Sequence, residues 1–371
     1  MGEDFYRGKN DRNIDIVNAI LYQQFQEGIL MGDIMYKVNG YTFNVESITA
    51  FLQLPEKEQW GEEELHSFLS TEGMQFVLHC ENEDGVSLKN GMKEMKRGKE
   101  SSLLSRKDSV WCEMWENKQR IQETYTLLKN RWEEIVERAY TTVQEFLLPT
   151  NHCTGTWFFV PGRGQKAYCT PEGCAIILGL KPYTESELRF MIASLIYRKY
   201  LLTTLNCHNN TTGSHSPFTP VETLLSITHR EGLITYVGLQ AAADTEFTAS
   251  YAVTEEDAAR YTDALTAALK ETSTDTPGIT EDADLMSTAT RIGCAMARAI
   301  DESIAEKEDG NRRGRDMLLG TLSYLGFISF LRHYKLSDTT VYDSKILWKA
   351  YELMEKERTL SGVKEDVFHM Q

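Results

Sequence analysis

The chain lacks the features that mark secreted and membrane-spanning proteins. Uninterrupted apolar runs of about 18 residues are missing, so we expect no transmembrane helix. The N-terminal stretch MGEDFYRGKNDRN is polar and lacks the apolar core of a signal peptide. The whole chain has 7 cysteines, an odd number spread along its length, which is unlike the disulfide framework of a secreted protein. We therefore predict a reduced protein of the cytoplasm or of a virion, not a secreted one.

The sequence motifs of common enzyme classes are also missing. The chain contains neither the phosphate-loop pattern GxxxxGK[ST] nor the nucleophile pattern GxSxG. Its PGRGQK stretch joins two predicted strands, whereas a phosphate loop joins a strand to a helix. Carboxylates are so numerous, with 55 Asp and Glu residues, that no catalytic pair stands out. The sequence thus predicts a protein that is not an enzyme and needs no cofactor.

Positive charge is scarce. The 39 Lys and Arg residues are outnumbered by the acidic ones, and the formal net charge is −16. A protein with this charge repels nucleic acid at long range. Any nucleic-acid contact therefore requires a local basic groove and an acidic surface elsewhere.

What the chain does have is helical periodicity. Apolar residues recur three and four positions apart over 109–148, where Trp111, Trp115, Tyr125 and Trp132 fall on the same stripe. We expect that stripe to pack in the core, the alternative being an exposed seam for a neighbouring subunit. Two amphipathic helices over 282–309 and 315–336 make the most apolar helical hairpin. Capping boxes predict further helix starts at Thr184 and Thr219.

Strand signals are short and few. Alternating residues around Asn39-Gly40 predict a β-hairpin over 34–45. A second hairpin is predicted over 156–169 around the turn PGRG, and Thr170-Pro171-Glu172 has the cap and first-turn proline of a helix start. The segment LITYVGL (233–239) is ambiguous between a strand and a buried helix.

These elements predict a mainly α protein with small β-hairpins and two helical lobes. The N-terminal lobe, 1–149, mixes helices and hairpins and ends in the long helix, which Pro149 terminates. The C-terminal lobe, 150–371, is mostly helical. A charged, locally basic stretch over 81–108 is predicted to be a loop or linker.

Arginine is concentrated in and near the 282–336 hairpin. Because the guanidinium fork binds phosphate bidentately, we predict a nucleic-acid-binding groove lined by basic residues of two helical regions. Its members are Arg291, Arg298, Arg312, Arg313, Arg315, Arg198 and Lys199. Four tyrosines would stack on bases there: Tyr197, Tyr200, Tyr324 and Tyr334. Nearby carboxylates leave the alternative that these are ordinary solvated helix faces.

Cysteine and histidine gather around the second hairpin, as His152, Cys153, Cys169 and Cys174. Zinc requires thiolates or imidazoles that converge on a tetrahedron, yet the paired CxxC or HxxxH spacing is missing. Free cysteine is commonly a small buried apolar residue. We predict that no metal is bound, and whether Cys153, Cys169 and Cys174 bind one stays open.

Two helical lobes with a basic groove are the organisation of viral nucleoproteins and helical coat proteins. We therefore predict a self-assembling, homo-oligomeric structural protein, a viral nucleocapsid or coat subunit that packages single-stranded RNA without reading its sequence. Two alternatives stay open. One is an acidic protein-binding adaptor or scaffold without nucleic acid, and the other is an enzyme with a site between the lobes.

Overall fold

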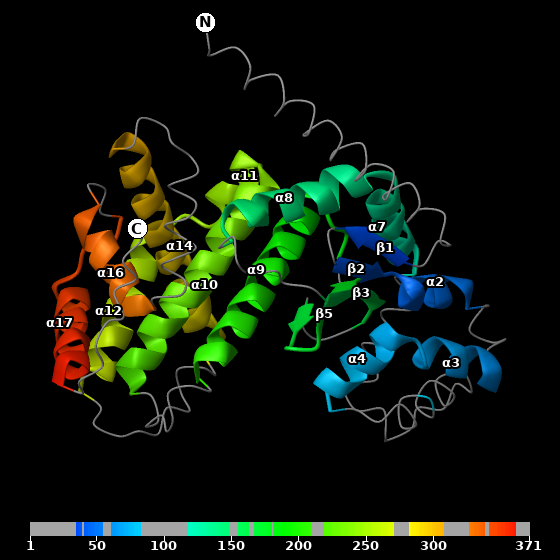
Figure 1. Cartoon of the computed structure of the whole chain (residues 1–371), viewed down its shortest axis with the longest axis horizontal. Helices are drawn as coiled ribbons and strands as arrows, with labels where there is room; N and C mark the ends of the chain where they lie inside the picture. The colour runs from blue at the N-terminus through cyan, green and yellow to red at the C-terminus, as the bar shows by residue number, and fades with distance from the viewer. Residues whose placement is uncertain are drawn as a thin grey trace, which may run out of the picture. The chain divides into compact units, whose positions relative to one another are not determined.

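The protein is mainly helical with one small β-sheet, as predicted (Figure 1). The computed structural model describes residues 35–38, 41–54, 61–82, 89, 118–147, 155–162, 167–179, 181–209, 219–270, 282–307, 326–337 and 341–360. The chain divides into two compact units, each built from two separate stretches. The first unit comprises Met1–Trp132 and Cys153–Thr184, and the second comprises Glu133–His152 and Glu185–Gln371. This division interleaves the chain, whereas the predicted one cuts it once at residue 149.

The first unit contains a five-stranded sheet with the order β1-β2-β3-β5-β4. Strands β1 and β2 pair in antiparallel fashion, which confirms the hairpin around Asn39-Gly40. Strand β2 then pairs in parallel with β3, and β3 in parallel with β5. The strands are β1 (Met35–Val38), β2 (Tyr41–Asn44), β3 (Gly155–Pro161), β4 (Ala167–Cys169) and β5 (Gly173–Leu178).

The second predicted hairpin is wrong in its pairing. Strands β3 and β4 exist, but β5 lies between them and pairs with both. Thr170-Pro171-Glu172 is the turn between β4 and β5, not a helix start, and the Thr170 N–H donates to the Gly173 carbonyl at 2.9 Å. The reason is that all of β5, GCAIIL, is buried. A strand buried on both faces reads as a continuous apolar run, so its local pattern does not distinguish it from a helix.

Aromatic side chains fill both faces of this sheet. On one face, Phe158 of β3 packs against Phe76 of α4 (Glu72–Cys80) with ring centroids 5.4 Å apart. On the other face, Phe43 of β2 packs edge-on against Trp132 at 5.3 Å. Helices α2 (Glu46–Gln53) and α3 (Glu62–Leu69) complete the helical cover. Trp132 is therefore a core residue, as its place in the stripe predicted.

The predicted long helix is described from residue 118 onwards. It consists of α7 (Lys118–Asn130), a π-helical turn η2 (Glu133–Glu137) and α8 (Arg138–Glu145). Its apolar stripe is buried at Ile121, Ile135 and Val143. The π-helical turn begins at the residue where the chain passes from the first unit to the second. Trp111 and Trp115 lie outside the described residues.

Helix α10 (Pro220–Ala242) is the centre of the second unit. It is buried along most of its length, and it includes LITYVGL, so that ambiguous segment is a buried helix. The predicted capping box is present, because the Thr219 side chain accepts from the Glu222 N–H and Glu222 accepts from the Thr219 N–H. Around α10 lie α9 (Glu185–Asn209), α11 (Thr245–Ala249), α12 (Glu255–Ala268), α14 (Ala283–Lys307), α16 (Phe327–Leu336) and, against α12 and α16, α17 (Lys345–Leu360).

Helices α10 and α14 cross closely enough to exclude side chains at the crossing. A Cβ atom on Gly293 would lie 1.8 Å from the Thr228 carbonyl oxygen, and one on Gly232 would lie 2.4 Å from the Gly293 backbone. Of the predicted 282–336 hairpin, α14 and α16 are described, while the basic link lies outside the described residues. In the part of the chain with described structure, no helix has the length and apolarity to cross a membrane.

Candidate functional site: an aromatic and arginine pocket

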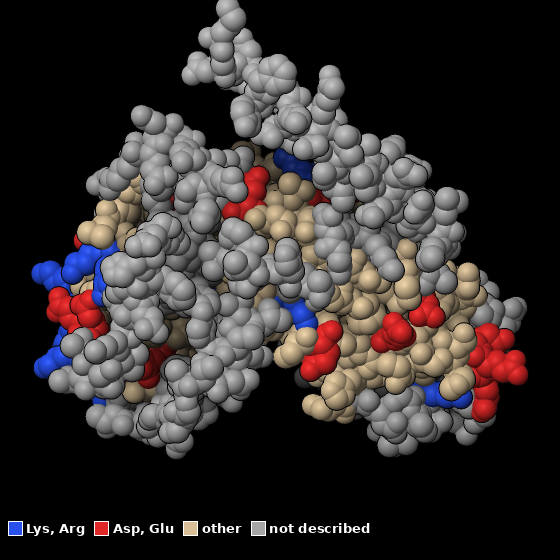
Figure 2. Space-filling view, in the orientation of Figure 1, with Lys and Arg blue, Asp and Glu red and all other residues tan. Residues whose placement is uncertain are grey.

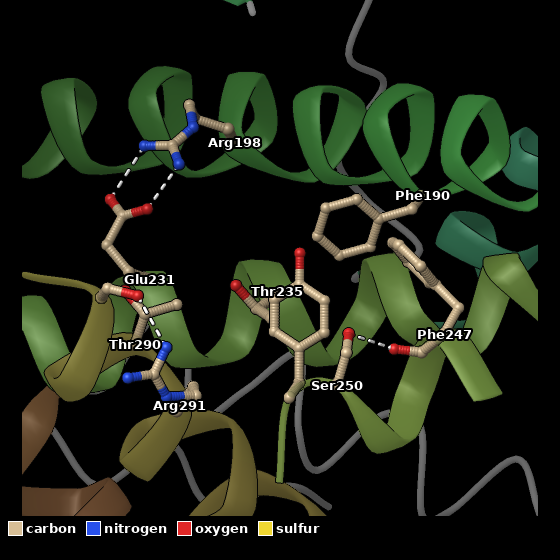
Figure 3. Close-up of a pocket in the computed structure, with 10 residues that line it drawn as sticks. Phe190, Arg198, Glu231, Thr235, Phe247, Ser250, Thr290 and Arg291 are labelled. Carbon is tan, nitrogen blue, oxygen red and sulfur yellow. Dashed lines mark hydrogen bonds and ion pairs between the residues drawn. The ribbon is translucent and has the colours of Figure 1, made fainter. Parts of the chain in front are cut away.

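The second unit contains a pocket of about 490 Å³ among α9, α10, α11 and α14 (Figure 3). Its lining combines aromatic rings, two arginines and several hydroxyl groups. The lining residues are Phe190, Arg198, Glu231, Thr235, Phe247, Ser250, Tyr251, Ser287, Thr290 and Arg291. Two of the basic residues predicted from the sequence, Arg198 and Arg291, therefore come together at one site.

The aromatic side of the pocket is a three-ring cluster. Phe190 lies 5.3 Å from Phe247 and 5.4 Å from Tyr251, measured between ring centroids, and Phe247 lies 5.7 Å from Tyr251. All three rings are half-buried. Burial raises the pKa of the Tyr251 hydroxyl, so this group is protonated at neutral pH.

Short helix α11 places Phe247 against the pocket. Helix α10 ends at Ala242, and the left-handed backbone of the following Ala243 (φ 52°) turns the chain. Asp244 then caps α11, because its carboxylate accepts the Phe247 N–H at 3.0 Å. That hydrogen bond is the main cause that lowers the pKa of Asp244. The cap ties the aromatic ring to the end of α10.

Arg198 reaches across from α9 to Glu231 of α10 (Figure 3). The two side chains form a bidentate ion pair, with one nitrogen–oxygen distance of 2.8 Å and the second contact shorter. Glu231 also accepts from Arg230 at 3.2 Å. On this wall of the pocket the positive charge of Arg198 is therefore balanced by the Glu231 carboxylate.

Arg291 forms the corresponding pair on α14. Its Nε donates to Asp257 of α12 at 3.0 Å, its Nη2 forms a shorter bond to the same carboxylate, and its Nη1 donates to Ser287 at 2.8 Å. These bonds hold the pKa of Asp257 far below its usual range and raise the pKa of Arg291. Asp257 is buried, with 5% of its surface exposed.

A second depression of about 450 Å³ adjoins the first. The two share Ser250, Ser287 and Arg291, so the Arg291 guanidinium lies between them. The second depression is polar and is lined by further ion-paired groups, among them Arg260 and Asp284, whose atoms lie 3.3 Å apart.

The other predicted residues are placed differently. Lys199 is buried, with 3% of its surface exposed, which removes it from any surface groove. Arg298 is half-buried on α14, two turns beyond Arg291, and does not line the pocket. Arg312, Arg313 and Arg315 lie outside the described residues, as does Tyr324. Tyr197, Tyr200 and Tyr334 are core residues with at most 1% exposed, so these tyrosines cannot stack on a base.

The sequence provided little signal for the pocket's remaining members. Glu231 follows Arg198 by 33 positions and Asp257 precedes Arg291 by 34, and no local spacing connects such pairs. Asp257 did have a signal, as the third residue of the capping box of Thr254, but that pattern indicates only a helix start. Phe190, Phe247 and Tyr251 resemble ordinary core residues in the sequence.

The cysteine group is only partly described. His152 and Cys153 lie outside the described residues. Cys169 and Cys174 lie side by side, with their sulfur atoms 2.7 Å apart. Within the described ranges, no cluster of three or more His, Cys, Asp or Glu side chains could hold a metal ion.

Charges of both signs are mixed on the face shown in Figure 2. Basic and acidic side chains lie next to one another over α16 and α17, where Arg332 pairs with Glu355 at 3.0 Å. The pattern matches that of the pocket, where each described arginine has a carboxylate partner.

Comparison with known proteins adds no assignment: no protein family, curated protein or solved structure matches this chain.

Proposed function

We propose that the chain is a self-assembling structural protein that binds single-stranded RNA, as in a viral nucleocapsid or coat, and that its pocket takes a nucleobase. One observation carries the proposal: Arg198 and Arg291 share a pocket with Phe190, Phe247 and Tyr251. Aromatic faces and guanidinium planes are the surfaces on which bases of single-stranded nucleic acids stack. Stacking tolerates any base, which suits packaging.

The charge balance of the pocket favours a base over a phosphate. Both arginines are paired with carboxylates, so their positive charge is neutralised within the wall. A phosphate bound there would face the Glu231 carboxylate as well as the arginines, and like charges repel. A neutral, planar base instead gains stacking area and hydrogen bonds to the hydroxyls of Thr235, Ser250 and Thr290.

Phosphate contacts then belong to other residues. Arg298 provides a cation outside the lining of the pocket, and the sequence adds the cluster Arg312, Arg313 and Arg315. The net charge of −16 requires that these cations act locally. Each phosphate that they contact would make the binding weaken further as salt is added. Assembly with further copies along one RNA strand would multiply the weak contacts of each subunit.

Ser250→Trp is the variant that tests the pocket, with Ala249→Trp as its matched control. Both residues are exposed on neighbouring positions, but only Ser250 lines the pocket. We expect Ser250→Trp to fill the pocket and weaken binding of a fluorescent oligouridine by about tenfold or more, the equivalent of one lost stacked base. Ala249→Trp should bind like the wild type in the same fluorescence anisotropy titration.

Assembly is measured on the same preparations, without nuclease treatment. Light scattering gives the particle size, and the ratio of absorbance at 260 and 280 nm gives the nucleic-acid content. We expect large particles that contain nucleic acid. A small particle free of nucleic acid, together with no oligouridine binding, would contradict the proposed function. Large particles without nucleic acid would instead support the scaffold alternative. Equal binding by the two tryptophan variants would remove the pocket from the proposal.

A further inference from the structure

We propose that Cys169 and Cys174 form an oxidation site, at which a peroxide converts the two thiols into a reversible disulfide between β4 and β5. The two residues face each other across the antiparallel ladder in register, and their sulfur atoms are in contact at 2.7 Å. The site lies in the sheet of the first unit, so it is independent of the pocket of the second.

The backbone geometry of β4 and β5 suits a disulfide between Cys169 and Cys174. The Thr170 N–H donates to the Gly173 carbonyl at 2.9 Å, which makes the next pair, Cys169 and Cys174, a non-hydrogen-bonded pair. Residues in that position have Cα atoms about 4.5 Å apart. Disulfides span Cα distances of about 4.4–6.8 Å, so the link forms without moving either strand.

The difference in solvent exposure predicts which of the two thiols is oxidised first. Cys174 is buried on β5, which lies between β3 and β4 in the sheet, with 1% of its surface exposed. Cys169 is half-buried on β4, which is the edge strand of the sheet. A small oxidant therefore meets Cys169 first, and Cys174 is the neighbour that resolves the oxidised sulfur.

The reaction balances with one hydrogen peroxide. The Cys169 thiolate attacks one peroxide oxygen, the O–O bond breaks, and a sulfenic acid and one water are formed. The Cys174 sulfur then attacks the sulfenic sulfur, the S–S bond forms, the S–O bond breaks, and a second water leaves. Two electrons pass from the sulfurs to the peroxide, and the two thiol protons end in water.

A third thiol, Cys80, lies at the end of α4 and is the competing partner. Burial raises its pKa, with further contributions from Glu81, Glu172 and Cys169, so it attacks poorly as a thiolate. The Tyr168 hydroxyl donates to Glu81 at 2.5 Å and holds β4 beside the end of α4. The ladder nevertheless places Cys174, not Cys80, directly opposite Cys169.

The disulfide would link the edge strand β4 covalently to β5. Strand β4 has 3 residues and, among the described strands, pairs with β5 alone. Such a short edge strand opens readily, because few hydrogen bonds hold it. The disulfide would keep it paired under oxidising conditions and release it on reduction.

Peptide mass spectrometry on the full chain tests this directly. Trypsin releases the two cysteines on one peptide, Ala167–Arg189, because Pro182 protects the bond after Lys181, and Cys80 on another. The reduced protein is exposed to hydrogen peroxide, alkylated and digested. We expect the Ala167–Arg189 peptide to lose two hydrogen atoms in mass and to accept no alkyl group, and a phosphine reductant to restore two alkylations.

Three variants complete the test. Cys80→Ser should form the disulfide as the wild type does. Cys169→Ser should leave the Cys174 thiol open to alkylation, and Cys174→Ser should stop at the Cys169 sulfenic acid, so neither variant forms the disulfide. Circular dichroism checks that each variant is folded, and neither Cys80→Ser nor Cys169→Ser changes a fully buried side chain. The proposal is overturned if both cysteines of the wild type stay alkylatable after peroxide, if Cys80 is linked to the 167–189 peptide instead, or if oxidation stops at sulfinic acid.

Discussion

At the scale of single residues, the pair of Asp257 and Arg291 connects three parts of the second unit. The Asp257 carboxylate caps α12 through Thr254, accepts the Thr288 hydroxyl at 3.2 Å, and orients the Arg291 guanidinium at the pocket. A buried carboxylate held by several donors stays ionised, which is why its pKa falls so far. One side chain thus serves both folding and the site.

Replacing Asp257 by Asn tests this role. At neutral pH we expect Asp257→Asn to lower the free energy of unfolding by about 2 kcal/mol, the usual cost of losing a charged hydrogen bond at a partly buried pair. Because the folded pKa of Asp257 is depressed, the wild type holds this stability above the unfolded pKa, about 4, and loses it as the pH falls towards the folded value. The deficit of the variant should therefore shrink in urea unfolding curves below about pH 4.

Asp284→Asn provides the control for that measurement. Its side chain is 82% exposed and pairs with Arg260 at 3.3 Å, and exposed pairs contribute little. We expect almost no change in unfolding at either pH. A deficit of Asp257→Asn that is equal at neutral and acidic pH would show that the ion pair is not its cause.

At the scale of elements, the crossing of α10 and α14 decides the packing of the second unit. The two helices approach so closely because Gly232 and Gly293 have no side chain, and the backbones come into contact. The capping box of α10 could be predicted, and the predicted helix over 282–309 is present as α14. The glycine contact could not be predicted, because a glycine within a helical sequence pattern looks only like a weak position.

Gly293→Ala should destabilise the protein strongly. Alanine gains up to about 1 kcal/mol of helix propensity over glycine. Here its Cβ would lie 1.8 Å from the Thr228 carbonyl oxygen, so the helices must separate. We expect a net loss of about 2–3 kcal/mol, measured as a lower midpoint in thermal unfolding, since overpacking outweighs propensity.

Ala295→Ser is the matched control, because it also adds one heavy atom, at a half-buried position of the same helix. Its unfolding midpoint should stay near that of the wild type. If Gly293→Ala melted at the wild-type temperature, the close crossing of α10 and α14 would be disproved.

At the scale of the whole molecule, the chain crosses between its two units more than once. Strands β3 and β5 follow residue 149 in the chain, but they complete the sheet that begins with β1 and β2. Conversely, Phe146 of α8 packs edge-on against Tyr236 of α10 at 6.2 Å, within the second unit. Each unit is thus built from two distant stretches of chain.

Two fragments of the chain distinguish this interleaved organisation from a division into two lobes at residue 149. A fragment of residues 1–184 contains every strand of the sheet and should fold, with cooperative urea unfolding and resistance to proteolysis. A fragment of residues 1–149 lacks β3, β4 and β5 and leaves Phe43 without its neighbours Trp157 and Phe159, so it should be unfolded and quickly digested. Equal folding of the two fragments would contradict the interleaved division.

The sequence by itself determined the local features of this protein. Helical periodicity, the capping box at Thr219 and the Asn39-Gly40 hairpin each depend on residues a few positions apart, so the sequence pattern alone predicts them. Only the tertiary structure decided the order of the strands, the partners of Arg198 and Arg291, and the aromatic rings beside them. Those contacts join residues tens of positions apart, and their energies depend on burial and distance, which no local pattern encodes.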